Sequence, residues 1–250
     1  MRILSLALSF ALIALPVTAE PTAPTDAKSR VAALQAALKG IDEAAKKSAI
    51  EHCGATPHAS TASALAAVLS KESDGLRIAT AQSLGKMKGI PEAVQVLHGG
   101  IGANLKKAVV LEAIFVALGA LADRASIPVC RDFAVQLAPS KDAAFCAPVK
   151  AALAALGQIR HKDSVDALVT ARAKLAANAG AILADTLAAA EEATSAAQSK
   201  LTGGQSARGA EFAKWWKRHG SEFNDDLTPR PAGGMRRGYD GGGSGGSGGY

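Results

Sequence analysis

Aromatic residues are scarce in this chain of 250 residues: Phe, Trp and Tyr supply only 4% of it, although 48% of the residues are hydrophobic. Sheets depend on aromatic and β-branched side chains, so the composition argues against an all-β sandwich or a doubly wound parallel sheet. Alanine, the best helix former, occurs 56 times. The apolar fraction also excludes wholesale disorder, because disordered chains are poor in Leu, Val and Ile. The composition therefore predicts an alanine-rich, all-α protein.

Cysteine is scarce as well, with only Cys53, Cys130 and Cys146. The helical pattern places Cys130 and Cys146 at similar heights on two consecutive antiparallel helices joined near residues 139–141. A disulfide between them is one interpretation. The other is that both are small buried apolar residues, as free cysteines commonly are. In either case Cys53 is left over.

Long apolar runs occur only at the N-terminus. Arg2 precedes an apolar stretch over residues 3–15, and Val17-x-Ala19 presents small residues for cleavage. This pattern is typical of a secretory signal peptide, whereas a membrane anchor needs about 20 apolar residues. We expect residues 1–19 to be removed, residues 20–25 to form a short linker, and the protein to be exported, periplasmic or secreted, without a membrane span. The remaining 27 basic and 22 acidic residues lack the clustered excess of a dedicated nucleic-acid binder.

Four segments of the chain share one pattern of small and apolar residues. In the clearest copy, Leu76-Arg77 is followed by a small residue and then by a Leu-Gly pair. The pair recurs after steps of 31, 34 and 38 residues, counted from a degenerate copy at Cys53-Gly54, and these steps suit a unit of two helices. The repeated positions in the three clear copies are Ala79, Leu84 and Gly85; Ala113, Leu118 and Gly119; and Ala151, Leu156 and Gly157.

Each repeated position has a physical interpretation. The small residue five positions before the Leu allows a neighbouring helix to approach closely. The Gly after the Leu is expected to adopt a positive φ and to end its helix.

The pattern resembles the HEAT family of helical repeats, in particular short HEAT-like units with a Val-Arg-x-x-Ala-x-x-x-Leu-Gly signature, over residues 42–170. The resemblance implies an α-solenoid of HEAT-like helix pairs, which we place at residues 26–223 with a terminal cap at 201–223. An irregular helical bundle is the alternative. In such arrays the concave face formed by successive second helices commonly binds partners.

The end of the array holds both tryptophans of the chain, Trp215 and Trp216. Leu201-Thr202-Gly203 followed by this pair resembles the closing segment of some exported bacterial HEAT-repeat proteins. In one interpretation the aromatic residues fold back on the last repeat as a cap. In the other, Trp216 with Lys217 and Arg218 is an aromatic and basic anchor for a partner. Residues 224–250 are rich in Gly and Ser and are expected to form a disordered tail.

No motif in the sequence carries recognisable chemistry. The histidines lack the spacing of a helical zinc site, and no P-loop, dinucleotide or nucleophile-elbow motif is present, so we expect no catalytic residue, metal or cofactor. The leading hypothesis is a non-catalytic scaffold that binds another protein. The second is binding of an anionic polymer, a glycan or nucleic acid, through basic residues, and the third is a lyase-like or glycosylase-like HEAT enzyme. The candidate binding residues are Lys106, Lys107, Lys214, Trp216, Lys217 and Arg218.

Overall fold

The computed structural model describes residues 26–204 and 209–230, and these ranges hold eleven α-helices, three short 3-10 helices and no strand. The chain is all-α, as predicted. The signal peptide and linker, residues 1–25, lie outside the described residues. None of the described helices is long and apolar enough to cross a membrane. The helices are α1 Ala27–Lys39, α2 Glu43–Gly54, α3 Ala59–Lys71, α4 Asp74–Leu84, α5 Pro91–Ala103, α6 Ala108–Leu121, α7 Ser126–Leu137, α8 Cys146–Leu156, α9 Lys162–Ala177, α10 Ala184–Leu201 and α11 Ala210–His219.

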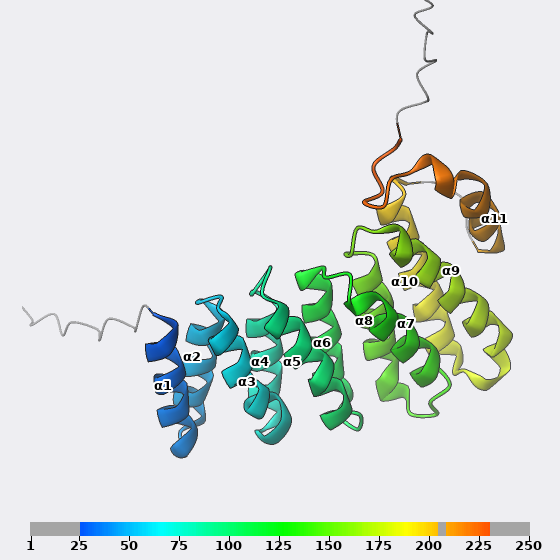
Figure 1. The fold of residues 1–250 in the computed structure, drawn as a ribbon. Coiled ribbons are helices and arrows are strands. Elements are labelled where there is room, and N and C mark those ends of the chain that lie inside the picture. Colours follow the sequence, from blue (N-terminus) through cyan, green and yellow to red (C-terminus); the bar gives the residue numbers. More distant parts are fainter. Residues whose placement is uncertain (1–25, 205–208, 231–250) are drawn as a thin grey trace, which may run out of the picture.

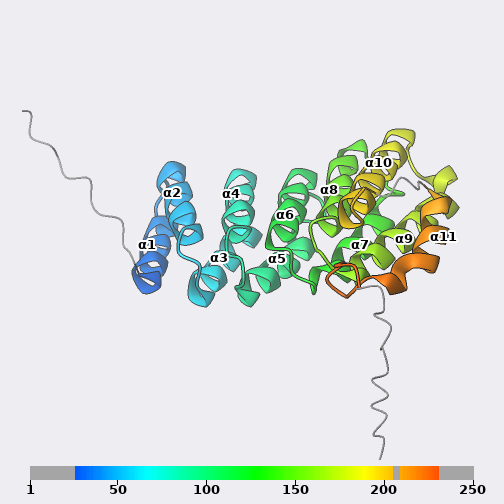
Figure 2. The ribbon, with the colours of Figure 1, turned by 90° about the horizontal axis from the view of Figure 1, so that it is seen from above.

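The first ten helices form two layers that run side by side along the array (Figures 1 and 2). Consecutive helices contact each other, except that α6 and α7 barely touch, and each helix from α1 to α8 also contacts the helix two positions further on. We call α1, α3, α5, α7 and α9 the odd layer, and α2, α4, α6, α8 and α10 the even layer. The result is an α-solenoid of five helix pairs, with α11 at the end opposite α1 (Figure 1).

The helices begin where the sequence supplies capping residues. The Asp42 carboxylate accepts hydrogen bonds from the backbone N–H groups of Ala44 and Ala45, and the Ser73 hydroxyl accepts one from Leu76. Pro91 occupies the first turn of α5, where its missing N–H is not needed. These local signals fix short connections, so consecutive helices pack as antiparallel pairs.

The leucine of each Leu-Gly pair is in the core between the layers. Leu84, Leu118 and Leu156 are all fully buried. Ala79 and Ala151 are buried too, whereas Ala113 is only half-buried and reaches the surface of the even layer. The repeated Leu thus anchors every signature helix to the odd layer.

The glycine of each pair has a role that differs from the prediction. Gly85 and Gly157 have φ values of −62° and −71°, and Gly119 lies inside α6, which ends only at Ala122 with φ 55°. The expected positive φ is therefore wrong, whereas the expected helix end is confirmed at Gly85 and Gly157, which directly follow α4 and α8. These glycines adopt ordinary helical geometry, so their conformational freedom is not what the fold uses.

These positions require glycine because it has no side chain, since each glycine lies where two even-layer helices approach most closely. A Cβ atom on Gly157 would lie 2.7 Å from the Cβ of Ala197, closer than two carbon atoms can pack. The same distance separates a Cβ on Gly54 from that of Ser83, and the corresponding distances to the nearest atoms of Ala117 and Ala155 are 3.0 Å for Gly85 and 3.1 Å for Gly119. Glycine on one helix and a small residue on the next thus set the spacing of the even layer.

The two layers are not equally tight. In the even layer, α6 and α8 share the most extensive contact of any helix pair, whereas α5 and α7 in the odd layer barely touch. The array therefore bends toward the even layer at this point, and the even-layer surface is on the inner side of the bend.

A buried polar cluster ties α3, α4 and α5 together. The Arg77 guanidinium donates to the Asn104 carbonyl oxygen through Nη1 and to the Glu72 backbone carbonyl through Nε, both at 2.7 Å. The Asn104 amide in turn donates to the backbone carbonyls of Leu69 and Gly100. The Arg77 cation is thus held by the Glu72 carbonyl at the C-terminal end of α3, where the helix dipole favours positive charge, and by the Asn104 side chain that follows α5.

The ordered chain extends beyond the predicted start of the tail at Asn224. Leu227 is buried, the Lys162 N–H donates to the Asp225 carbonyl at 2.8 Å, and Arg160 Nε donates to the Asp226 carbonyl at 3.0 Å. Residues 224–230 therefore close the end of α8 and the start of α9, because Leu227 finds apolar cover there. The prediction of disorder is wrong for this stretch, and residues 231–250 lie outside the described residues.

The glycine contacts lead to a direct test of stability. Gly157→Ala places a methyl group against Ala197 on α10, so we expect the free energy of unfolding to fall by about 1–3 kcal/mol. Gly99→Ala is the matched control, because a Cβ at this exposed position in α5 meets no atom within 4 Å. There the better helix propensity of alanine is expected to raise stability by about 0.5–1 kcal/mol. Urea unfolding followed by circular dichroism checks both, and equal effects at the two positions would contradict the close-contact role.

Candidate functional site

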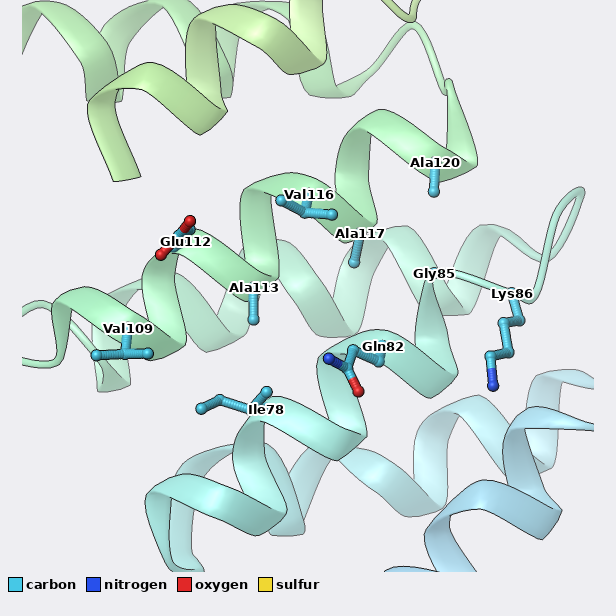
Figure 3. A pocket seen from close by; sticks show the side chains of 10 residues that line it. All are labelled: Ile78, Gln82, Gly85, Lys86, Val109, Glu112, Ala113, Val116, Ala117 and Ala120. Atoms are coloured by element: carbon cyan, nitrogen blue, oxygen red, sulfur yellow. The ribbon is translucent and has the colours of Figure 1, made fainter. Parts of the chain in front are cut away.

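An apolar groove runs along the surface of the even layer between α4 and α6 (Figure 3). Its free volume is about 410 Å³. The side chains of Ile78 and Gln82 enter it from α4, and those of Val109, Ala113 and Ala117 enter it from α6 (Figure 3). The complete lining is Ile78, Gln82, Gly85, Lys86, Val109, Glu112, Ala113, Val116, Ala117 and Ala120. We call this the α4–α6 groove.

The α4–α6 groove holds two of the most exposed large hydrophobic side chains in the described part of the chain. Val109 is 64% exposed and Val116 is 60% exposed. A third, Leu105, lies in the turn just before α6. Single exposed apolar residues are ordinary, but a cluster beside a groove is characteristic of an interaction surface.

The sequence of α6 explains why this face is apolar. Over Ala108–Leu121 the only charged residue is Glu112. One face of the helix is buried in the core, including Ile114 and Phe115. The opposite face carries an apolar row at spacings of four, three and four residues, which aligns its members along one side of a helix. This row consists of Val109, Ala113, Val116 and Ala120.

The same surface continues on the other side of α6. A second groove of about 310 Å³ lies between α6 and α8, and we call it the α6–α8 groove. It shares Val116 and Ala120 with the first groove, and Ala151, Ala154 and Ala155 form its α8 side. The apolar surface therefore spans three neighbouring helices of the even layer.

Charged groups border the α4–α6 groove without partners. Lys86 is exposed just beyond the end of α4, and Glu112 is half-buried on α6. Neither forms an ion pair with another described residue. On the next helices, by contrast, Lys150 of α8 pairs with Glu192 of α10 at 3.1 Å. The groove thus has one cation and one anion available to an incoming ligand.

The predicted basic residues do not form one site. Lys106 and Lys107 lie in the turn before α6, where Lys107 is engaged by Asp74. Lys214 lies on α11 and is paired with Glu211 at 2.8 Å. Lys217 and Arg218 are exposed on the same helix. The helices α7 to α10 separate these two groups along the array (Figure 1), so they offer no continuous basic surface.

Trp216 belongs to the packing at the end of the array. It is 8% exposed, and its Nε1 donates a hydrogen bond to the Asp166 carboxylate of α9 at 2.7 Å. Phe212 on the same helix is fully buried. The half-buried Trp215 stacks on His219, with ring centroids 5.3 Å apart. The interpretation of Trp216 as an exposed anchor is therefore wrong, because its ring packs against Phe223 and its N–H is bound to α9.

The three cysteines are free thiols, so the disulfide between Cys130 and Cys146 is not formed. A short 3-10 helix, Ala143–Phe145, delays the start of α8 until Cys146. Cys130 lies seven residues before the end of α7, about 10 Å along the helix axis, so the two residues are at different heights. Cys146 Sγ instead contacts the Asp185 carbonyl at 3.8 Å.

Neither groove has the set of titratable or metal-ligating side chains that a catalytic or metal centre requires. The titratable side chains that line the two grooves are Lys86 and Glu112 alone. Among the described residues, no group of three or more His, Cys, Asp or Glu side chains is placed to hold a metal ion. The surface is built for contact with apolar groups.

Comparison with protein families agrees with the repeat architecture. A HEAT repeats model matches residues 31–114, and a PBS lyase HEAT-like repeat model matches residues 149–172. The chain therefore contains HEAT repeats in these two segments. HEAT repeats generally serve as protein-interaction scaffolds, and seven of the ten residues that line the α4–α6 groove lie within the first matched segment. Comparison with curated proteins gives no significant match.

The exposed row on α6 was not anticipated from the sequence. The signal was present, because a helix that is apolar all round is expected either to be buried on every side or to meet a partner. The choice between these depends on which neighbours cover α6. The structure shows that α4 and α8 leave its outer face open.

Thiol accessibility gives a test of the cysteine environments. Burial raises the pKa of the Cys130 thiol to about 12 and also raises the pKa of the Cys53 thiol. Since the thiolate is the reactive form, both stay protonated and slow to react at pH 8. We expect iodoacetamide to alkylate the partly exposed Cys146 first in the folded protein. Mass spectrometry of peptides after timed labelling measures the order, and equal labelling in urea is the control. Early modification of Cys130 would contradict the packing of α7.

Proposed function

We propose that this HEAT-repeat protein is a non-catalytic scaffold that binds another protein through the even-layer surface centred on α6. The observation that carries the proposal is the exposure of Val109 and Val116 beside a preformed groove. Covering the exposed part of each valine is worth about 1 kcal/mol. The apolar surface is thus a source of affinity that a partner gains only by contact.

The extent of the surface also supports a protein as the ligand. A stable interface covers about 800 Å² on each partner, which is more than a single groove between two helices provides. The α6–α8 groove continues the apolar surface past Val116. A partner that spans α4 to α8 would therefore have the area and the apolar centre that such interfaces have.

We further propose that the scaffold acts outside the cytoplasm. The support is the pattern of residues 1–19, in which Arg2 precedes an apolar stretch and small residues follow at Val17 and Ala19. In that compartment the partner would be another exported or envelope protein.

The proposal of a protein partner is preferred to that of an anionic polymer. The candidate lysines lie in two separate groups, and Lys107 and Lys214 are already engaged by carboxylates. In addition, Glu112 lies on the apolar surface itself, where it would repel a polyanion. An enzymatic function has no support from these grooves, since a lone lysine and a lone glutamate about two helical turns apart do not form a catalytic pair.

A charge placed on the apolar row tests the proposal. We expect Val116→Glu to abolish partner capture, because the carboxylate would be buried without a partner, while the exposed site keeps the effect on stability within about 0.5 kcal/mol. Gln95→Glu is the control, since it adds the same charge to an exposed position on α5 of the odd layer. The measurement is quantitative mass spectrometry of proteins crosslinked to each variant in its native compartment. An identical set of partners for Val116→Glu and the unmodified chain would refute the proposal.

A further inference from the structure

We propose that the occupant of the α4–α6 groove is an amphipathic helix of the partner protein, with a basic residue beside Glu112 and an acidic residue beside Lys86. This inference rests on the proposed function, because it takes the even-layer surface to be the binding surface. It adds the secondary structure of the bound segment and the pattern of its charges.

The shape of the groove selects an elongated apolar ligand. The exposed row runs from Val109 to Ala120, which corresponds to about 16 Å of helix. Because Gly85 has no side chain, and Ala113 and Ala117 end at Cβ, the groove floor is shallow enough for side chains from above to reach (Figure 3). A ligand helix of about three turns, with apolar side chains at positions i, i+4 and i+7, matches this length and contacts the row along one face.

Backbone hydrogen bonding distinguishes a helix from an extended peptide. The main-chain N–H and C=O groups of α4 and α6 along the groove are hydrogen-bonded within their own helices, so they cannot pair with the backbone of an extended peptide. An extended segment pressed against Val109 and Val116 would bury its own N–H and C=O groups without partners, at a cost of about 1–3 kcal/mol for each. A helix satisfies these groups internally and presents only side chains to the groove.

The charges of the groove fix the polar pattern of the ligand. Gly85 and Gly119 are equivalent in the repeat, so Ile78 and Glu112, each seven residues earlier, lie at the same height on neighbouring helices. Lys86 follows Ile78 by eight residues, which places it about 12 Å further along the groove. A ligand helix that pairs with both therefore carries opposite charges seven or eight residues apart. Their order in the sequence reports the direction in which the helix lies.

The mixed charge also argues for a selective partner. With a cation and an anion at the groove, a uniformly acidic or uniformly basic segment would gain one ion pair and meet one like charge. Charge complementarity of this kind suppresses wrong partners and fixes the register of the right one. The apolar row supplies affinity, and the two charges supply selectivity.

The test is a selection from a displayed library of helical 16-residue peptides against the full chain. Variant Val116→Glu serves for counter-selection, and Gln95→Glu serves as the control that must bind like the unmodified chain. We expect the enriched peptides to carry apolar residues at i, i+4 and i+7, to bear opposite charges seven or eight positions apart, and to gain helicity on binding by circular dichroism.

Reversing the charges of Lys86 and Glu112 tests directly whether the peptide forms the two proposed ion pairs. For an enriched peptide, we expect Lys86→Glu or Glu112→Lys alone to weaken binding by about tenfold, because each substitution replaces an ion pair with two like charges. The same peptide with its two charges exchanged is expected to prefer the double variant K86E/E112K, whose groove carries the opposite pattern. Isothermal titration calorimetry at low and high salt measures each Kd.

The outcomes separate this inference from the proposed function. If enriched peptides lose binding in Val116→Glu but ignore both charge reversals, or if they bind in an extended form, the groove is a docking site and the inference is wrong. Enrichment of acidic peptides without apolar residues also overturns it. If the peptides bind Val116→Glu as well as the unmodified chain, or if none is enriched, both proposals fail.

Discussion

The close approach of neighbouring even-layer helices is the constraint on which the rest of the structure depends. At four successive contacts a glycine on one helix meets a small residue on the next, and a single Cβ atom would fill the space between Gly157 and Ala197. This contact sets the spacing of the even layer, and α6 and α8 meet so extensively that the array bends toward that layer. The small side chains that allow the approach also form the floors of the grooves, so the close packing of the even layer and its grooves have one origin.

The helix pairs could be predicted from the sequence, but the role of the glycines could not. The spacing of the Leu-Gly pairs gave the two-helix unit, and the burial of Leu84, Leu118 and Leu156 follows from the same pattern. A glycine after the last apolar residue of a helix is typical of a helix terminus; α4 and α8 do end before Gly85 and Gly157, but neither glycine adopts the positive φ, and Gly119 lies inside α6. A local pattern cannot distinguish a glycine that frees the backbone from one that admits a neighbour more than 30 residues away.

The resemblance to HEAT repeats indicated the face formed by the second helices, but the exposed residues on that face could not be predicted, because exposure depends on which helices cover which. Trp216 is a residue type common at interface anchors, yet it is buried and Asp166 satisfies its N–H. Val116 has the composition of a core residue, yet it lies in the open between two grooves. In both cases the residue type led to an expectation about burial or exposure that does not hold at this position. Only the arrangement of the neighbouring helices decided the matter.

The helix α6 stands out because the two polar contacts that join α8 to α10 are not repeated between α4 and α6. At the position of Glu112 in the repeat, α8 carries Lys150, but this lysine pairs with Glu192 on α10 and leaves Glu112 available. At the position after the repeat glycine, α8 carries Gln158, which accepts a hydrogen bond from Lys200, whereas α6 carries Ala120 and gives Lys86 no acceptor. Between α4 and α6 the corresponding positions place Ile78 opposite Glu112 and Lys86 opposite Ala120, so neither charge meets one of opposite sign. Two unpaired charges therefore lie beside exposed valines, and an ordinary solvated surface requires neither feature.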